Sequence, residues 1–464
     1  MIWGGAEQGS GRENPMPFPK SILRTRLPLL LRQVLYNLRG GFLLRPLFIA
    51  LTLGAAGALL SQLEEIAPVL SGWVPHALFP SRADPQVAQV ILGTIGASIM
   101  TVVSIVFAIL LMTLTLASMQ FSPRIIIGFA RDHVTQWTLG IFLGTFCYCM
   151  AALPAARSLP RPFAPVATVV GAMLLALACV GWLLFFIHHI SRAISVNEIV
   201  DKIASETESV IDQMMPWPHR PGRVPDDGQL DTSAWDTVIT SEASGYIRFV
   251  YIERLVTLAK SYKVKVAALR RVGNFVPAGV PLLRLHKGER LPPENRSELR
   301  RTFDLGPSRT LQQDIEFGVL QIVDIALKAI SPAVNDPSTA ISCVDQLSRI
   351  LIRFAGKQAP SSVFYDPPGV VRVILPGIAF ERLLDSAFEQ IRLYSTADVA
   401  VSLRLLRALG DVAITTADPA YRRTLAERGR RIVAGCAARL GAQELEPLRA
   451  RLVALEGLVA PSAQ

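Results

Sequence analysis

The sequence predicts a membrane α-helical protein with four spans and a cytoplasmic α+β region. The 30 residues from Val90 to Met119 carry no charge and would form about 45 Å of helix, longer than the roughly 30 Å hydrocarbon core of a bilayer. Apolar residues make up 51% of the chain and charged residues only 18%, which departs from ordinary soluble proteins in both respects. After residue 236, strand-like and then amphipathic helical patterns replace the long apolar runs.

Four apolar segments can cross a bilayer as helices, and the loops between them differ in charge. Basic residues precede the first segment, separate the second from the third, and follow the fourth. Because cytoplasmic loops are enriched in Lys and Arg, both chain ends are expected in the cytoplasm, and only the loop with Arg157 and Arg161 departs from the pattern. The segments are 46–63, 90–119, 137–153 and 165–187.

Composition divides the whole chain into five regions. Residues 1–45 combine a tail that is expected to be disordered with a basic amphipathic helix on the inner membrane surface. A four-helix transmembrane domain at 46–190 is followed by a connecting helix at 191–216. A linker rich in proline and glycine then leads to a small β-rich module at 236–290 and a mainly helical cytoplasmic domain at 295–460.

Small hydroxylated residues form a stripe along the second span. They recur mainly at spacings of three and four, which places them on one face of a helix with larger apolar residues on the others. Such a face suits close packing against a neighbouring helix or the lining of a water-filled pore, since both favour small hydroxylated side chains. The stripe consists of Thr94, Ser98, Thr101, Ser104, Thr115 and Ser118.

The connecting helix carries a regular apolar pattern. From Val196 to Met214 its apolar positions alternate four and three apart, as in a coiled-coil seam of three heptads. An amphipathic helix that packs onto its own domain has the same pattern. Self-association through Val200 and Ile203 is therefore one of two interpretations.

The module at 236–290 has strand-like runs around a helical segment. A turn with Gly273 and Gly279 precedes its last strand, which predicts a small β-barrel or sandwich-like fold. Lipoyl-type domains are similarly punctuated by glycine, but this stretch lacks a lysine in a tight hairpin that would accept lipoate or biotin. We therefore expect a structural module. Further along, VFYDPPGVVRVILP is expected to form a hairpin.

Two helices around a sharp corner are predicted between Leu311 and Phe354. Asp336 stands at an N-cap position and Pro337 at the first helical position, which gives the corner a structural explanation. Polar residues nearby in the sequence could instead converge on a ligand or cation. Capping and ion pairing account for them without one, and this interpretation is favoured. The candidates are Arg309, Asp314, Asn335 and Asp336, with Glu316 and Asp324 close to them in sequence.

The chain resembles a known family in two motifs. The corner sequence SPAVNDPSTA, preceded by RTLQQDIEFGVLQIVDIA, and the helix end QFSPR, followed by LGIFLGTFCY, are similar to signatures of a family of bacterial predicted membrane proteins. That family is catalogued only as a domain of unknown function. The resemblance covers roughly residues 30 to 440 and implies an integral membrane protein with a cytoplasmic C-terminal domain. It supplies no activity and no site residues.

Several function classes find no support in the sequence. The net charge of +10 is not accompanied by a nucleic-acid-binding pattern, and GxSxG, HExxH, Walker and GxGxxG motifs are absent. The five cysteines form no CxxC or Cys/His cluster, so neither an enzyme nor a metal or cofactor site is expected. Ion-coupled transport usually requires ionisable groups inside the membrane, and the four segments contain none.

We therefore expect a multi-pass protein of the bacterial inner membrane that contacts the lipid bilayer and forms a homo-oligomer. Channel-like permeation, gated or regulated by the cytoplasmic domain, is the leading hypothesis. A passive pore requires no intramembrane charge, because hydroxyl-lined and hydrophobic constrictions can conduct. The competing hypothesis is a non-conducting scaffold or sensor whose cytoplasmic domain binds a ligand or a protein partner.

Overall fold

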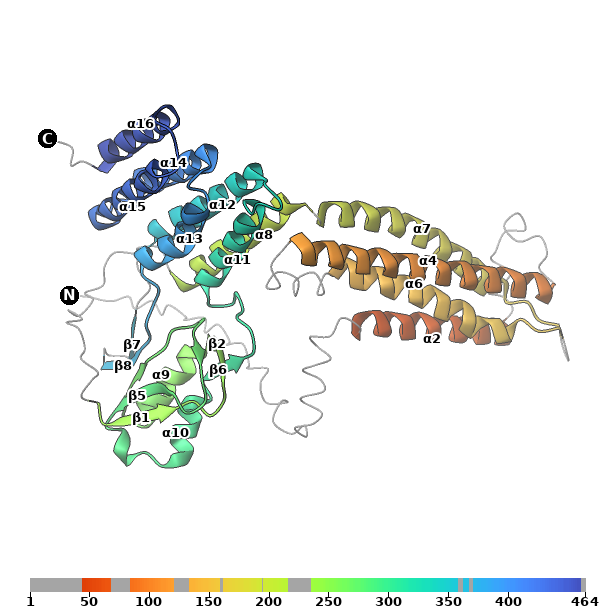
Figure 1. Cartoon of the computed structure of the whole chain (residues 1–464). Helices are drawn as coiled ribbons and strands as arrows, with labels where there is room; N and C mark the ends of the chain where they lie inside the picture. Colours follow the sequence, from red (N-terminus) through yellow and green to blue (C-terminus); the bar gives the residue numbers. More distant parts are fainter. Residues whose placement is uncertain are drawn as a thin grey trace, which may run out of the picture. The chain divides into compact units, whose positions relative to one another are not determined.

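The computed structural model separates into two compact units (Figure 1). The membrane unit comprises residues 1–108 and 130–186, and the C-terminal unit comprises 187–464 together with 109–129. The amphipathic helix expected before residue 45 and the QFSPR motif beyond Gln120 lie outside the described residues. The structure describes residues 44–67, 84–120, 133–158, 162–193, 195–215, 235–357, 362–366 and 370–459.

In the described part of the chain, four helices are long and apolar enough to cross a membrane, as predicted. Their centres lie in the membrane unit, while the last residues of the second and fourth group with the C-terminal unit. A short 3-10 helix, η2 (Leu153–Ala155), follows the third. The four helices are α2 (Leu44–Ile66), α4 (Pro85–Gln120), α6 (His133–Ala152) and α7 (Val166–Ala193).

Helices α2 and α6 approach each other closely through glycines on both helices. A Cβ at Gly140 or Gly144 of α6 would lie within about 2.6 Å of Ile49 or Leu53 side-chain atoms of α2. A Cβ at Gly57 of α2 would lie 2.6 Å from the backbone oxygen of Tyr148. Small residues allow helices to pack at this distance in lipid, where the hydrophobic effect does not drive helices together.

One carboxylate is buried in the membrane unit, just beyond the end of the first predicted span. Helix α2 extends through Ile66, three residues beyond the predicted span, and therefore includes Glu64. The Glu64 side chain is 1% exposed and accepts hydrogen bonds from the backbone nitrogens of Ala167 and Thr168 at 2.8 and 3.1 Å. These nitrogens belong to the first turn of α7, so Glu64 satisfies donors that a helix leaves unpaired.

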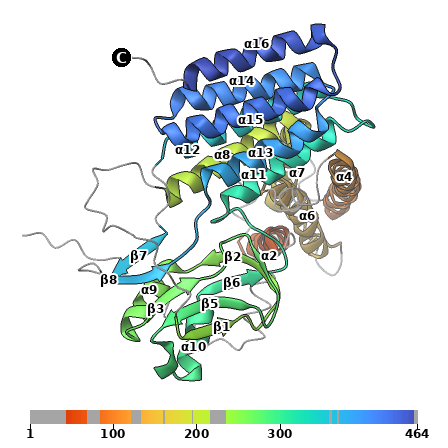
Figure 2. The same ribbon diagram turned by 60° about the vertical axis from the view of Figure 1, so that its left-hand side comes forward.

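The C-terminal unit contains a helical subdomain with one continuous apolar core. Figure 2 shows its helices stacked beside one another. The α11–α12 and α12–α14 pairs are in contact, as are α14–α16 and α15–α16. The subdomain consists of α8 (Val196–Met214), α11 (Ile315–Ala329), α12 (Pro337–Ala355), α13 (Phe380–Tyr394), α14 (Val399–Thr415), α15 (Pro419–Ala437) and α16 (Ala442–Val459).

The apolar face of α8 lies inside this core. Val200 and Ile203 are buried against α11 and α12 of the same chain, so the packing interpretation of the heptad pattern is the one that the structure supports. The structure gives no support to self-association through this seam, because its apolar residues already pack within the chain. The contact is close: a Cβ at Gly318 of α11 would lie 2.0 Å from Oγ1 of Thr207 in α8.

The remaining part of the C-terminal unit, here called the sheet module, has two sheets. Strand order is β1-β5-β3-β8-β7 in the larger sheet and β4-β2-β6 in the smaller. All pairs are antiparallel except β3–β8. The strands are β1 (Thr237–Thr240), β2 (Gly245–Val250), β3 (Lys265–Ala268), β4 (Phe275–Val276), β5 (Pro281–His286), β6 (Phe303–Gly306), β7 (Val363–Asp366) and β8 (Val370–Ile374), with helices α9 (Ile252–Ser261), α10 (Pro293–Arg300) and η3 (Gly288–Arg290).

The module differs from the predicted barrel or sandwich of residues 236–290 in closure and in extent. Neither sheet closes on itself among the described residues, and β6, β7 and β8 come from beyond residue 290. The predicted hairpin at 363–374 is confirmed, and its second strand pairs in parallel with β3 (Figure 2). A hairpin inserted between α12 and α13 therefore completes the sheet.

The corner between α11 and α12 contains the N-cap predicted from the sequence. The Asp336 carboxylate accepts hydrogen bonds from the Thr339 backbone nitrogen at 3.1 Å and hydroxyl at 2.5 Å. Pro337 occupies the first helical position. Asn335 has a left-handed backbone with φ 51°, a conformation that asparagine tolerates better than most residues.

We expect Asp336→Ala to lower the free energy of unfolding of the C-terminal unit by about 0.5–2 kcal/mol, because the variant loses this cap. Asp336→Asn should stay within about 0.5 kcal/mol of the parent, since asparagine caps about as well as aspartate. Chemical denaturation of the detergent-solubilised chain measures both. Equal stability of the alanine variant and the parent would contradict the capping role.

Candidate functional site

The four predicted corner residues separate into two groups at opposite ends of α11. Arg309 and Asp314 precede the helix, whereas Asn335 and Asp336 follow it. Since α11 has 15 residues, it spans about 22 Å, too far for the four side chains to share one ligand. The structure therefore places two smaller polar groups where the sequence suggested one.

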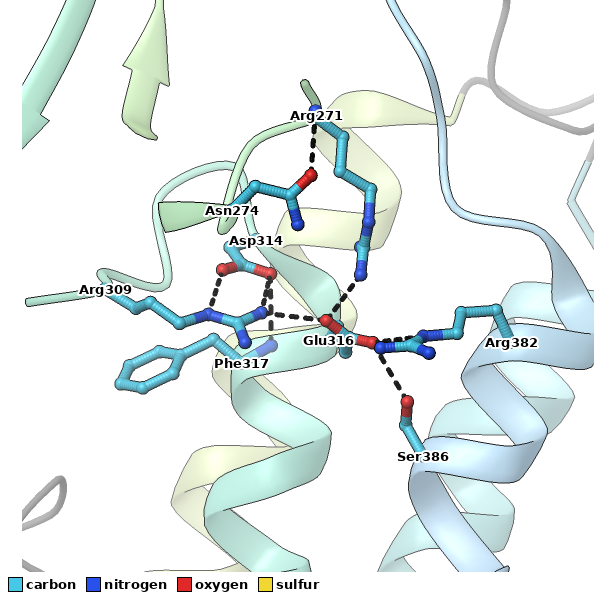
Figure 3. A network of polar contacts seen from close by, with 8 residues as sticks. All are labelled: Arg271, Asn274, Arg309, Asp314, Glu316, Phe317, Arg382 and Ser386. Atoms are coloured by element: carbon cyan, nitrogen blue, oxygen red, sulfur yellow. Dashed lines mark hydrogen bonds and ion pairs between the residues drawn. The ribbon is translucent and has the colours of Figure 1, made fainter. Parts of the chain in front are cut away.

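The first group centres on Asp314, which caps α11. Its Oδ1 accepts from the Phe317 backbone nitrogen at 3.2 Å. Arg309 donates to both carboxylate oxygens, at 2.7 and 2.8 Å, and its guanidinium lies over the Phe317 ring (Figure 3). Gly273 approaches from the turn before β4 with φ 88°, and a Cβ there would lie 2.3 Å from Asp314 Oδ2. Only glycine fits both the backbone conformation and the space.

Glu316, in the first turn of α11, connects three arginines. Its Oε2 accepts from Arg271 at 2.6 Å and from Arg309 at 3.1 Å. Its Oε1 accepts from Arg382 at 3.0 Å and from the Ser386 hydroxyl at 3.0 Å (Figure 3). Arg271 follows β3, whereas Arg382 and Ser386 lie on α13, so one carboxylate links the sheet module to two helices of the helical subdomain.

The pKa values of the two carboxyl groups in this cluster are shifted in opposite directions. Burial by itself raises the pKa of Glu316, but the charge of Arg271 and the hydrogen bonds from Arg271, Arg382 and Ser386 lower it to about 2. Burial raises the pKa of Asp314, and the bonds from Arg309 only partly oppose this. Glu316 is therefore an ionised acceptor at any physiological pH.

These contacts make the cluster suited to holding elements together. Both oxygens of Glu316 and both oxygens of Asp314 already accept hydrogen bonds. A general base requires a proton acceptor that is open to a substrate, and neither carboxylate fits this role. Within the described ranges, no group of three His, Cys, Asp or Glu side chains could hold a metal ion.

The stripe of α4 lies on the outer surface of its unit. Thr94, Ser98, Thr101 and Ser104 are exposed, whereas Leu92, Ile99 and Val106 point to the other helices and are buried. Thr115 is also exposed, and the side chain of Ser118 lies outside the described residues.

Sequence reasoning identified one side of the cluster and missed the other. Arg309, Asp314 and Glu316 lie within eight residues and were visible as a charged group before a helix. Arg271 and Arg382 are separated from Glu316 by 45 and 66 positions, and no local pattern links them to it. A single arginine after a strand or in an amphipathic helix is indistinguishable from a solvated surface residue.

Removing the central charge should destabilise the C-terminal unit. We expect Glu316→Gln to cost about 3–5 kcal/mol of unfolding free energy, because buried arginines lose their counter-ion. Arg382→Gln is the control: its side chain is 67% exposed, and its loss should cost about 0–1 kcal/mol. Chemical denaturation at neutral pH separates the two, and equal effects would contradict the central role of Glu316.

The parent and the Glu316→Gln variant also provide a test by pH. The folded pKa of Glu316, about 2, lies below its ordinary value of 4.5, so its contribution to stability is present above pH 4.5 and is lost as the pH falls towards 2. The difference between parent and Glu316→Gln should therefore shrink over this interval. A difference that stays constant down to pH 2 would show that the ionised carboxylate is not what stabilises the cluster.

Comparison with known proteins places the chain in a family. The family model for a predicted membrane protein (DUF2254) matches residues 39–411. Uncharacterized proteins of Mycobacterium bovis and Mycobacterium tuberculosis are 33% identical over 402 residues, which covers 84% of this chain and 75% of each relative. No solved structure matches the chain. With four apolar helices and a family match over most of its length, the chain belongs to the DUF2254 family of predicted membrane proteins.

Proposed function

We propose that the protein is an oligomeric inner-membrane protein with channel-like permeation, in which copies of α4 meet around a common axis. The C-terminal unit, on the cytoplasmic side, would regulate the membrane unit. The observation that carries this proposal is the outward position of the α4 stripe. No other described helix of the same chain covers Thr94, Ser98, Thr101 and Ser104.

The outward surface of α4 combines large apolar residues with a face of small ones, and the small face supports a specific partner for α4. Large exposed side chains that suit contact with lipid tails occur on both helices, among them Ile105 and Met112 of α4 and Leu177 and Leu184 of α7. On α4, Gly93 has no heavy atom within 4 Å of where a Cβ would be, and its small neighbours continue this open face. A face of small residues permits another helix, or water along an axis of several copies, to come close.

Three hydroxyl groups of the stripe can lie in water or against another helix without an unsatisfied donor. Thr101 and Ser104 each donate to the backbone oxygen four residues earlier, at 3.1 Å, and Thr115 does so at 2.8 Å. Because these bonds use only the hydroxyl hydrogens, both lone pairs of each oxygen remain available to water or to a partner helix. Burying these hydroxyl groups against another helix therefore costs little free energy, and the same groups can line a water-filled path.

The alternative is a non-conducting scaffold or sensor. It is favoured by the cavity beside Glu316 in the C-terminal unit, which could hold a ligand whether or not anything crosses the membrane. Solute flux through liposomes containing the purified protein discriminates between the two functions. Flux supports permeation, and its absence in folded, reconstituted protein supports the alternative.

Cysteine accessibility tests the position of the stripe directly. In a background without Cys147, Cys149 and Cys179, cysteines at Thr94, Ser98, Thr101 and Ser104 should react with a charged methanethiosulfonate reagent, because water allows the thiolate to form. Two sets of controls should resist it. Cysteines at Ile99 and Val106 point into the membrane unit, and cysteines at Leu177 and Leu184 face lipid.

The pattern of reaction decides between the possible environments. A reactive stripe with silent controls supports the pore. If the stripe is as silent as Leu177 and Leu184, the channel hypothesis in this form is wrong. Ser98→Leu then distinguishes the remaining cases: it should reduce the native mass in detergent if the stripe packs on another copy, and leave it unchanged if the stripe faces lipid.

Orientation follows from charge. Arg45 is the second residue of α2 and Arg192 lies in the last turn of α7, and these basic residues support a cytoplasmic location for both helix ends. With an even number of spans, both chain ends would then lie in the cytoplasm. Reporter fusions at residue 464 and near Met16 should give cytoplasmic signals, and a fusion near Gly72 should give the opposite one. An external signal at residue 464 would overturn the regulatory part of the proposal.

A further inference from the structure

A cavity of about 290 Å³ lies beside the Glu316 cluster, within the C-terminal unit. Its volume is close to the lower end of the range for small-molecule sites. Most of its wall is apolar and comes from both parts of the unit. The sheet module contributes β2, α9, the turn after β3 and β7, the helical subdomain contributes the end of α8 and the start of α11, and the segment between β8 and α13 joins them. Apolar residues of the wall include Met214, Val250, Val272, Ile315, Phe364 and Ile378.

Charged residues line the cavity as well. They are Arg270 and Arg271 on the turn after β3, and Asp314 and Glu316 at the start of α11. Arg271 is bound to Glu316, but Arg270 is exposed and makes no hydrogen bond or ion pair with any described residue. A guanidinium with free donors at the rim of an apolar cavity can bind a carboxylate or phosphate with two parallel hydrogen bonds.

The surrounding charges reinforce this preference. Four arginines and two acids make up the rim and the cluster behind it, which leaves two positive charges in excess. An additional anionic group in this place would be attracted, whereas a cation would be repelled. The arginines are Arg270, Arg271, Arg309 and Arg382, and the acids are Asp314 and Glu316.

We propose that this cavity binds a small organic anion with a ring-sized apolar body and one carboxylate or phosphate group. The apolar body fills the space between Phe364, Val272 and Ile378, and the anionic group pairs with Arg270. Since the wall comes from the sheet module and from the segment leading into α13, the bound anion stabilises the contact between the two parts. Binding is independent of permeation, and only its regulatory consequence rests on the proposed function.

Equilibrium dialysis of the full chain in detergent tests the site, with protein-free micelles as the blank. The probe is naphthoate, which combines two fused rings with a carboxylate. Naphthalenemethanol has the same rings without the charge, and inorganic phosphate has the charge without the rings. Saturable binding is expected for naphthoate, with binding of the other two weaker by about tenfold or more.

Variants at two positions, Arg270 and Ile378, test whether naphthoate binds in the cavity. Arg270→Gln should weaken naphthoate binding by about tenfold or more, and Arg270→Lys less than that, because lysine keeps the charge but not the fork of donors. Ile378→Trp should abolish binding by filling the space. Arg290→Gln, at an exposed arginine of η3 outside the cavity, is the matched control and should bind as the parent does.

The proposal is overturned if naphthoate fails to bind saturably or if Arg270→Gln and Arg290→Gln bind it equally. It is also overturned if the uncharged alcohol or phosphate alone binds as tightly as naphthoate. Melting temperatures close to the parent value establish that each variant is folded, and Arg270→Gln, a change of an exposed side chain, keeps the test decisive if Ile378→Trp does not fold. Solute flux through liposomes without naphthoate binding would contradict this site and leave the proposed function intact. Naphthoate binding without flux would support the site and contradict the proposed permeation.

Discussion

The C-terminal unit depends on one buried carboxylate shared by three arginines. Each arginine comes from a different part of the chain: Arg271 from the turn after β3, Arg309 from the segment before α11, and Arg382 from α13. Burial of an ion is costly unless its hydrogen bonds are fulfilled, so this arrangement is stable only when all the elements are in place. The cluster therefore links the sheet module to the helical subdomain, and loss of the Glu316 charge would leave its buried arginines without a counter-ion.

The sheet module and the helical subdomain are also connected through the backbone. The chain leaves the helical subdomain after α12, adds β7 and β8 to the larger sheet, and returns at α13. Gln313, immediately before α11, forms two hydrogen bonds with the backbone of Val250 in β2, at 2.9 and 3.2 Å. The sheets therefore extend beyond the boundary at residue 290 that composition predicts, because composition cannot reveal that a later hairpin pairs with an earlier strand.

Local features were predictable from the sequence and distant pairings were not. The four apolar helices, the Asp336 cap and the hairpin at 363–374 each depend on residues that are near in sequence. The bonds from the Ala167 and Thr168 nitrogens to Glu64 span more than 100 positions, and the apolar face of α8 has the same pattern whether it packs within its chain or between chains. In each of these cases the deciding information lies in a partner that sequence spacing does not identify.

The connection between the two units bears on the proposed regulation. Helix α7 ends at Ala193 and α8 begins at Val196, so only two residues lie between a membrane helix and a helix buried in the C-terminal core. Helix α8 packs closely on α11 where a Cβ at Gly318 would meet Thr207, and α11 begins at the Glu316 cluster. Packed helices move as rigid elements with few arrangements, because interiors are dense. Under the proposed function, a ligand that favours one arrangement around Glu316 would therefore act on α7 through α8, without a contact of its own in the membrane.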